Sequence, residues 1–160
     1  MIPMLEPASQ QEAYDMVYDG FELSEKLGYP VWCVSLPVWP TPVQVWSDVN
    51  KGGNKMHTPE DGRQRFILLP ALARKRFKTL IAAQDTFTAF SEASPYNAYF
   101  DGPNKELGII TTGIAFNYLS ENYPDGFEHP VLKISQYPLP RKMVEKIVRE
   151  CKEILVLEEG

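Results

Sequence analysis

The chain has 160 residues, of which 44% are hydrophobic, and a formal net charge of -5 at pH 7. This length and composition suit one compact domain, or a small domain with an appendage, and the negative charge makes nucleic acid a poor candidate partner. No apolar run reaches the roughly 18 to 20 residues that cross a membrane, and the start "MIPMLEPAS" lacks the pattern of a signal peptide, so we expect a cytoplasmic protein.

A helix and then a strand are predicted at the start of the chain. Ser9 and Glu12 have the spacing of a capping box, in which hydroxyl and carboxylate satisfy the first amides of a helix. Gly28 and Pro30 end the helix. The run "VWCVSL" at 31–36 is then a mostly apolar strand, of the kind that is buried on both faces of a parallel sheet.

A loop is expected next. Prolines end the strand, and the polar, turn-rich "NKGGNKMHTPEDG" at 50–62 contains His57. A single histidine without a second histidine or a cysteine nearby is typical of a solvated residue, so we do not assign His57 as a ligand or base.

A long helix is predicted from Ala71 to Ala93, because this stretch has no Gly or Pro and places apolar residues, among them Phe77 and Ile81, near one stripe. Its cationic cluster, Arg74 to Lys78, spans more than one face. A solvated helix surface is the preferred interpretation, and anion binding is the alternative.

Strands and helices alternate in the last third. Strands are predicted at "GIITT", "VLKISQY" and "ILVLEE", separated by helices at "AFNYLSENY" and from Arg141 to Lys152, the second with Val148 and Cys151 on its inward face. Strands joined by helices imply crossover connections, so the fold class is α/β, with a mostly parallel sheet flanked by helices.

A glycine turn between strand and helix is the candidate site. Gly108 and Gly113 have a Gly-X-X-X-X-Gly spacing, but the lysine and hydroxyl of a phosphate-binding loop do not follow, and a dinucleotide fingerprint needs a third glycine. The preferred interpretation is a tight turn with Thr111 or Thr112 capping the helix. The amides at Thr112, Gly113 and Ile114 remain a candidate anion-binding turn.

The other reactive side chains do not form a recognisable catalytic set. Cys33 and Cys151 are expected to be buried free thiols, and without a Cys-X-X-Cys motif the chain cannot by itself hold an iron-sulfur cluster or a thiolate zinc site. His129 has no nucleophile paired with it. The adjacent acids at 60–61 and 158–159 point apart, so neither pair predicts an acid/base dyad.

Four stretches, taken in order, resemble the alpha subunit of indolepyruvate ferredoxin oxidoreductases, in the wider 2-oxoacid:ferredoxin oxidoreductase family. They are "EPASQQEAYDMVYDGFELSEKLGYPV" (6–31), "SPYN" (94–97), "LGIITTGIAFNYLSE" (107–121) and "VLKISQYPLPRKMVEKIVRECKEILVLEE" (131–159). The ordered set is more specific than any single stretch.

The resemblance implies three parts. Residues 1–40 would be the last helix and strand of a pyrimidine-binding domain, 41–104 a linker with a loop and a long helix, and 105–160 an α/β domain similar to the transketolase C-terminal domain. The whole enzyme would decarboxylate an arylpyruvate-type 2-oxoacid to an acyl-CoA and reduce ferredoxin. Thiamine diphosphate, magnesium and [4Fe-4S] clusters would be bound by other parts of that complex, so no cofactor, metal or catalytic residue is expected here.

One stretch departs from the family. Members typically carry an Arg and then a Thr-Thr-Arg-X-Ser-His-like turn after the first strand, where this chain has the uncharged "VSLPVWPTP" at 34–42. A divergent branch and a site without its chemistry both remain open. Trp39 and Trp46 are assigned to core packing, with an apolar pocket as the alternative.

Two hypotheses follow. The preferred one is an excised or separately encoded structural and subunit-contact piece of such an alpha subunit, whose partners are its other domains or subunits. The alternative is a stand-alone module, not an enzyme, that binds a small anion at the Gly113 turn, with the Arg74 to Lys78 cluster nearby. Both predict self-association, because a small sheet exposes its edges.

Overall fold

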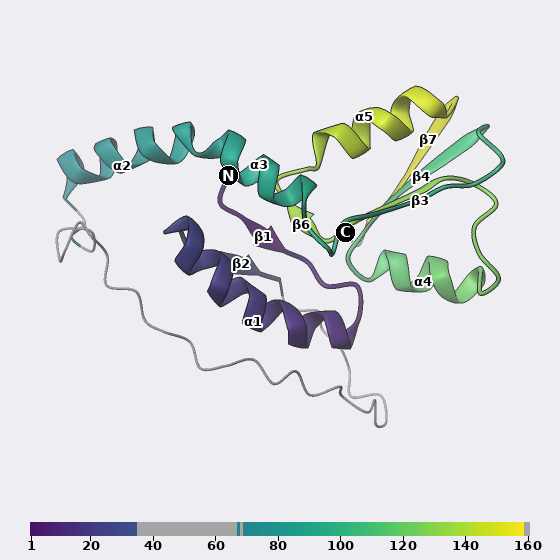
Figure 1. The fold of residues 1–160 in the computed structure, drawn as a ribbon, viewed down its shortest axis with the longest axis horizontal. Coiled ribbons are helices and arrows are strands. Elements are labelled where there is room, and N and C mark those ends of the chain that lie inside the picture. The colour runs from purple at the N-terminus through teal and green to yellow at the C-terminus, as the bar shows by residue number, and fades with distance from the viewer. Residues whose placement is uncertain (35–66, 68, 159–160) are drawn as a thin grey trace.

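The structure, a computed structural model, describes residues 1–34, 67 and 69–158 (Figure 1). In this part the chain forms five helices and seven short strands in two sheets. Several predictions lie outside it: the end of the first strand, the loop at 50–62 with His57, both Trp39 and Trp46, the acids at 60–61, and Glu159.

The first helix has the capping predicted for it. Helix α1 (Gln10–Leu27) begins after Ser9, whose side chain accepts from the Glu12 amide, and ends at Gly28 in the left-handed conformation. The Glu12 carboxylate in turn accepts from the Ala8 amide at 2.9 Å. The two reciprocal bonds of the capping box are therefore present, but the second one comes from the amide of Ala8, one residue before the cap residue Ser9.

A small sheet joins the two ends of the described chain. Strand β1 (Met4–Leu5), which the sequence did not predict, pairs in parallel with β2 (Trp32–Cys33) and antiparallel with β6 (Gln136–Tyr137). Among the residues that the structure describes, β2 pairs only with β1 and lies at the sheet edge, and Trp32 and Cys33 are exposed. The expectations of a strand buried on both faces and of a buried Cys33 thiol are therefore wrong for these residues.

The larger sheet contains β3 (Ala98–Phe100), β4 (Leu107–Thr112), β5 (Val131–Ile134) and β7 (Glu153–Leu157), in the order β3-β5-β4-β7. Strand β4 is parallel to both of its neighbours, and β3, which was not predicted, is antiparallel to β5. The α/β class with a mostly parallel sheet is confirmed.

Helices α4 (Ala115–Asn122) and α5 (Arg141–Glu150) cover the two faces of this sheet (Figure 1). One core lies on the α4 side and another on the α5 side, because side chains alternate between faces along β4 and β5. The buried members are Ile109, Leu119 and Val131 in the first, and Leu132, Ile134, Ile147 and Cys151 in the second. The buried Cys151 is as predicted, whereas Val148 is exposed.

The predicted long helix is two helices. Helix α2 (Pro70–Ala82) and α3 (Gln84–Glu92) are separated at Ala83. The Gln84 side chain donates to the Leu80 carbonyl and to the Met1 carbonyl, at 2.8 and 2.9 Å, which ties the break to the start of the chain. Phe87 of α3 is buried, but α2 buries none of its residues, so the predicted apolar stripe is packed only in its second half.

The predicted strand "VLKISQY" is also divided. Strand β5 ends at Ile134, and β6 begins at Gln136 in the other sheet. The buried Asn97 holds this division: its Oδ1 accepts from the amides of Ser135 and Gln136, at 2.8 and 2.9 Å. The Asn97 side chain thus accepts the backbone hydrogen bonds that a neighbouring strand would otherwise accept at this junction.

No helix in the described residues has the length and apolar character needed to span a membrane.

Candidate functional site

The carboxyl end of β4 is the natural place to look for a site, since open α/β sheets bind ligands at the carboxyl ends of parallel strands. Thr112 ends β4, Gly113 makes the turn, and Ile114 is the N-cap residue of α4. Neither Thr111 nor Thr112 caps α4, which has no side-chain cap bond, so that prediction is wrong. The tight strand-to-helix turn is confirmed.

Gly113 is required by its backbone and by a neighbour. Its φ is +49°, in the left-handed region that favours glycine, and a Cβ there would lie 2.6 Å from Glu6 Oε1. The carboxylate of Glu6, just after β1, therefore lies directly against the turn.

Glu6 is fixed in this position by hydrogen bonds. Its Oε2 accepts from the Tyr137 hydroxyl at 2.8 Å, and its amide donates to the Ser135 carbonyl at 2.7 Å. Burial, and then the hydrogen bond to the Glu6 carboxylate, raise the pKa of Tyr137 well above its usual range, so this hydroxyl stays a donor. The chain thus supplies its own anion at the predicted anion-binding turn of Thr112, Gly113 and Ile114.

Gly108 has a different role from Gly113. A Cβ at Gly108 would lie 2.9 Å from both Cys151 Sγ and Ile147 Cγ1, so this glycine lets α5 approach the sheet closely. The Gly-X-X-X-X-Gly spacing arises because Gly108 and Gly113 each meet a separate packing requirement. It does not form a phosphate-binding loop.

A buried polar row lies near the carboxyl end of the sheet, on the α4 face. Thr111 is opposite Lys133 in the β4–β5 register, and Ser135 follows two positions later. Lys133 is almost buried; its ammonium forms an ion pair with Glu12 of α1 and lies 4.9 Å from the ring centroid of Phe116. Sequence reasoning did not single out Lys133, because its counter-charge is on a helix 121 positions away.

Two hydroxyls in this row are unusual. Thr111 and Ser135 are fully buried, and within the described part of the chain neither side-chain oxygen has a hydrogen-bond partner. An unpaired buried hydroxyl lowers stability relative to a bonded one. The row therefore contains an ion pair and two hydroxyls, but this geometry does not pair a nucleophile with a base.

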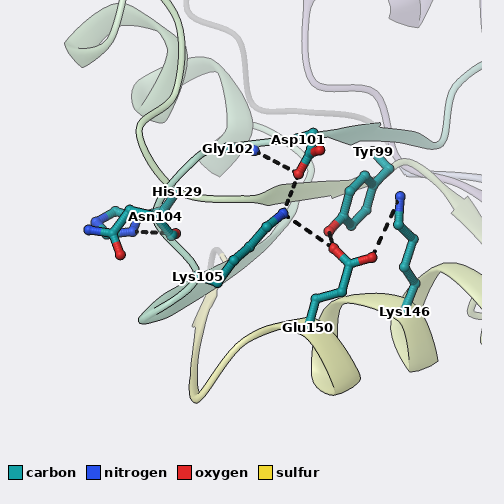
Figure 2. A network of polar contacts seen from close by, with 8 residues as sticks. All are labelled: Tyr99, Asp101, Gly102, Asn104, Lys105, His129, Lys146 and Glu150. Carbon is teal, nitrogen blue, oxygen red and sulfur yellow. Dashed lines mark hydrogen bonds and ion pairs between the residues drawn. The ribbon is translucent and has the colours of Figure 1, made fainter.

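A charge network lies at the opposite, amino end of β4. Figure 2 shows Lys105 between Asp101 and Glu150, with an ion pair to each; the Lys105–Glu150 distance is 3.3 Å. Glu150, at the end of α5, accepts from the Tyr99 hydroxyl at 2.7 Å, and Lys146 lies 3.7 Å from the Tyr99 ring centroid. The network joins the end of α5 to β3 and to the entry of β4.

The carboxyl groups of this network are favoured in their charged form. The Tyr99 hydrogen bond and then Lys105 lower the pKa of Glu150, and the hydrogen bond from Lys105 lowers the pKa of Asp101. Each positive group has an acidic neighbour, so the network is typical of structural ion pairing rather than of a binding site for an external ion.

The other candidate functional residues do not form a common site in the described structure. Nδ1 of His129 lies 3.1 Å from the Asn104 carbonyl oxygen, in the loops at the amino end of the sheet (Figure 2). The cluster from Arg74 to Lys78 is on α2, which projects from the side of the molecule away from α4 (Figure 1), so it does not lie near the Gly113 turn. Among the residues that the structure describes, no group of three or more His, Cys, Asp or Glu side chains is placed to hold a metal ion.

Comparison with known proteins gives one consistent similarity. The chain is 34% identical over 166 residues to the indolepyruvate oxidoreductase subunit IorA of Methanothermobacter thermautotrophicus, covering 99% of the chain and 26% of that subunit. The same named subunits of Archaeoglobus fulgidus and Pyrococcus abyssi are 32% identical over 167 residues and 31% over 172, with the same coverage. The chain thus spans about a quarter of the length of the curated relatives it matches. No family model matches the chain, and no solved structure matches it significantly.

Proposed function

This similarity confirms the resemblance to the alpha subunit of indolepyruvate oxidoreductases, and from it we propose that the chain is a structural and subunit-contact part of such an enzyme. The single observation that carries the proposal is a match along 99% of this chain to only 26% of a subunit with that name.

The proposed parent complex oxidises a 2-oxoacid of the arylpyruvate type. The acid loses carbon dioxide, its acyl group passes to coenzyme A, and the two electrons released reduce ferredoxin. Thiamine diphosphate, magnesium and [4Fe-4S] clusters would supply this chemistry when bound by other parts of the complex.

The groups in this chain do not suit those cofactors. The whole sequence has two cysteines, whereas a [4Fe-4S] cluster takes about four thiolates. At the Gly113 turn, a Cβ would lie 2.6 Å from Glu6 Oε1, so a carboxylate lies beside the turn and would repel a diphosphate brought there. We therefore propose no catalytic step for residues of this chain.

The surface of the chain supports a contact role. Large apolar side chains with more than half of their surface exposed lie on separate elements, namely Trp32, Phe77 and Phe21 on β2, α2 and α1. Such side chains are normal on a protein surface when they are scattered singly, so they offer apolar area for the proposed contact with another part of the subunit without fixing its position.

A chimera tests the proposal. The segment of the M. thermautotrophicus subunit that matches this chain is replaced by the 160 residues, and the subunit is expressed with its partner subunit. We expect the chimera to assemble and to retain indolepyruvate-dependent reduction of an electron acceptor, whereas deletion of the segment abolishes both.

Two controls make the result decisive. A chimera with Asn97→Ala, which destabilises the junction between the sheets, should assemble poorly. Calorimetry on the isolated chain with thiamine diphosphate and magnesium should give no binding heat. Tight magnesium-dependent binding to the isolated chain, or a chimera no better than the deletion, would refute the proposal.

A further inference from the structure

Helix α2 lacks a packing partner in the described structure. It has 13 residues, none of them buried, and it extends beyond α3 away from both sheets (Figure 1). A helix of this length is marginal in water unless one face is packed. Its apolar face therefore needs a surface that the described residues of a single copy do not provide.

The exposed face of α2 combines apolar and positive side chains. Phe77 and Ile81, four positions apart, are 62% and 57% exposed. Arg74 and Lys78 have the same spacing and flank them along one side of the helix. A complementary surface must offer apolar contacts with carboxylates beside them.

Helix α1 offers such a surface. Val17 and Phe21, again four positions apart, are 50% and 60% exposed. The exposed carboxylates of Glu22 and Glu25 follow them in the C-terminal half of the helix. The two helix faces thus match in spacing and are opposite in charge.

We propose that α2 of one copy docks on the exposed face of α1 of a second copy, with Phe77 and Ile81 against Val17 and Phe21. Both faces are exposed within one chain, so they do not cover each other in the same copy. Arg74 and Lys78 then lie beside Glu22 and Glu25, and this charge complementarity selects a second copy over an unrelated apolar surface. The contact needs only this chain and is independent of the proposed enzyme.

Charge reversal tests the contact, with sedimentation velocity of the full chain as the readout. Variant one carries Arg74→Glu and Lys78→Glu, and variant two carries Glu22→Lys and Glu25→Lys. Each alone opposes like charges in the contact, so each should raise the dissociation constant of self-association by about tenfold or more. An equimolar mixture should associate again, since α2 of either variant then faces an α1 of opposite charge.

A matched control separates specific contacts from net charge. The variant Arg141→Glu and Arg149→Glu changes the net charge as variant one does, at exposed positions of α5, and should associate like the unmodified chain. Circular dichroism checks that every variant is folded. Phe77→Ser should weaken association without any change in charge.

Specific results would overturn the inference. These are an unmodified chain that is monomeric at every concentration, association that neither reversal weakens, or a mixture of the two variants that stays monomeric while both are folded. A monomeric chain that still supports an active chimera would refute this contact and leave the proposed function standing.

Discussion

At the scale of single residues, the glycines show what a sequence can and cannot predict. The turn at Gly113 was predictable, because a strand pattern runs directly into a helix pattern there. The reason that only glycine fits there was not predictable, because the contacting carboxylate belongs to Glu6, more than a hundred positions earlier. Gly108 is similar, with the close neighbours Ile147 and Cys151 on a later helix. The candidate anion-binding role of the turn stays a prediction.

We expect Gly113→Ala to destabilise the chain by about 1 to 2 kcal/mol from its left-handed backbone alone, with a further loss because Glu6 must move. In the double variant with Glu6→Ala, the loss caused by moving Glu6 disappears. The losses in unfolding free energy of the two single variants should therefore add to more than the loss measured for the double variant. Urea unfolding of the two single variants and the double variant measures this. Strict additivity would show that Glu6 does not press on the turn.

At the scale of elements, local signals were sufficient where an element is long or capped. Helix α1 has its cap residues in the sequence, and β4, α4, α5 and β7 follow their apolar periodicity. The short strands β1 and β3, and the division of β6 from β5, were missed, because two or three residues form a strand only through partners that are distant in sequence. The break at Ala83 was missed for the same reason, since Gln84 bonds to Met1.

The network at the end of α5 predicts how these elements respond to acid. Asp101 and Glu150 have lowered pKa values, so their contribution to stability is present above their unfolded pKa, about 4. It is lost as the pH falls through the lower, folded values.

Replacing Lys105, the cation that Asp101 and Glu150 share, should reduce the loss of stability in acid. We expect Lys105→Met to unfold at lower urea concentration than the unmodified chain near neutral pH, and the difference to shrink as the pH falls below about 4. Urea midpoints across the acid range test it, with the exposed Lys75→Met as the control. A difference that is constant with pH would contradict the assigned pairing.

At the scale of the whole molecule, the two sheets meet through side chains rather than through a continuous backbone ladder. Glu6 bonds to Tyr137, Lys133 pairs with Glu12, and Asn97 holds the junction between β5 and β6. These partners are 38 to 131 positions apart in the sequence, so periodicity gave no sign of them. The division at 1–40, 41–104 and 105–160 likewise stays a prediction.

Asn97 should be the most sensitive of these links. Asn97→Ala leaves the amides of Ser135 and Gln136 buried without their acceptor. Each unpaired amide costs about 1 to 3 kcal/mol, so we expect a loss of roughly 2 to 6 kcal/mol in unfolding free energy. Thermal and urea unfolding measure it. Asn117→Ala, at a partly buried position, removes a solvent-exposed bond to Glu121 and should cost little, and equal effects of the two would contradict this role.

The pairing of β1 with β6 has a consequence for synthesis on the ribosome. Glu6 cannot meet Tyr137, which lies 131 positions later in the sequence, until that length has been translated. At about 5 to 20 residues per second, that delay is roughly 7 to 26 seconds. During that delay the earlier segment of the nascent chain exposes Leu5 and Met16, which the finished fold buries, and so presents apolar surface of the kind that chaperones bind.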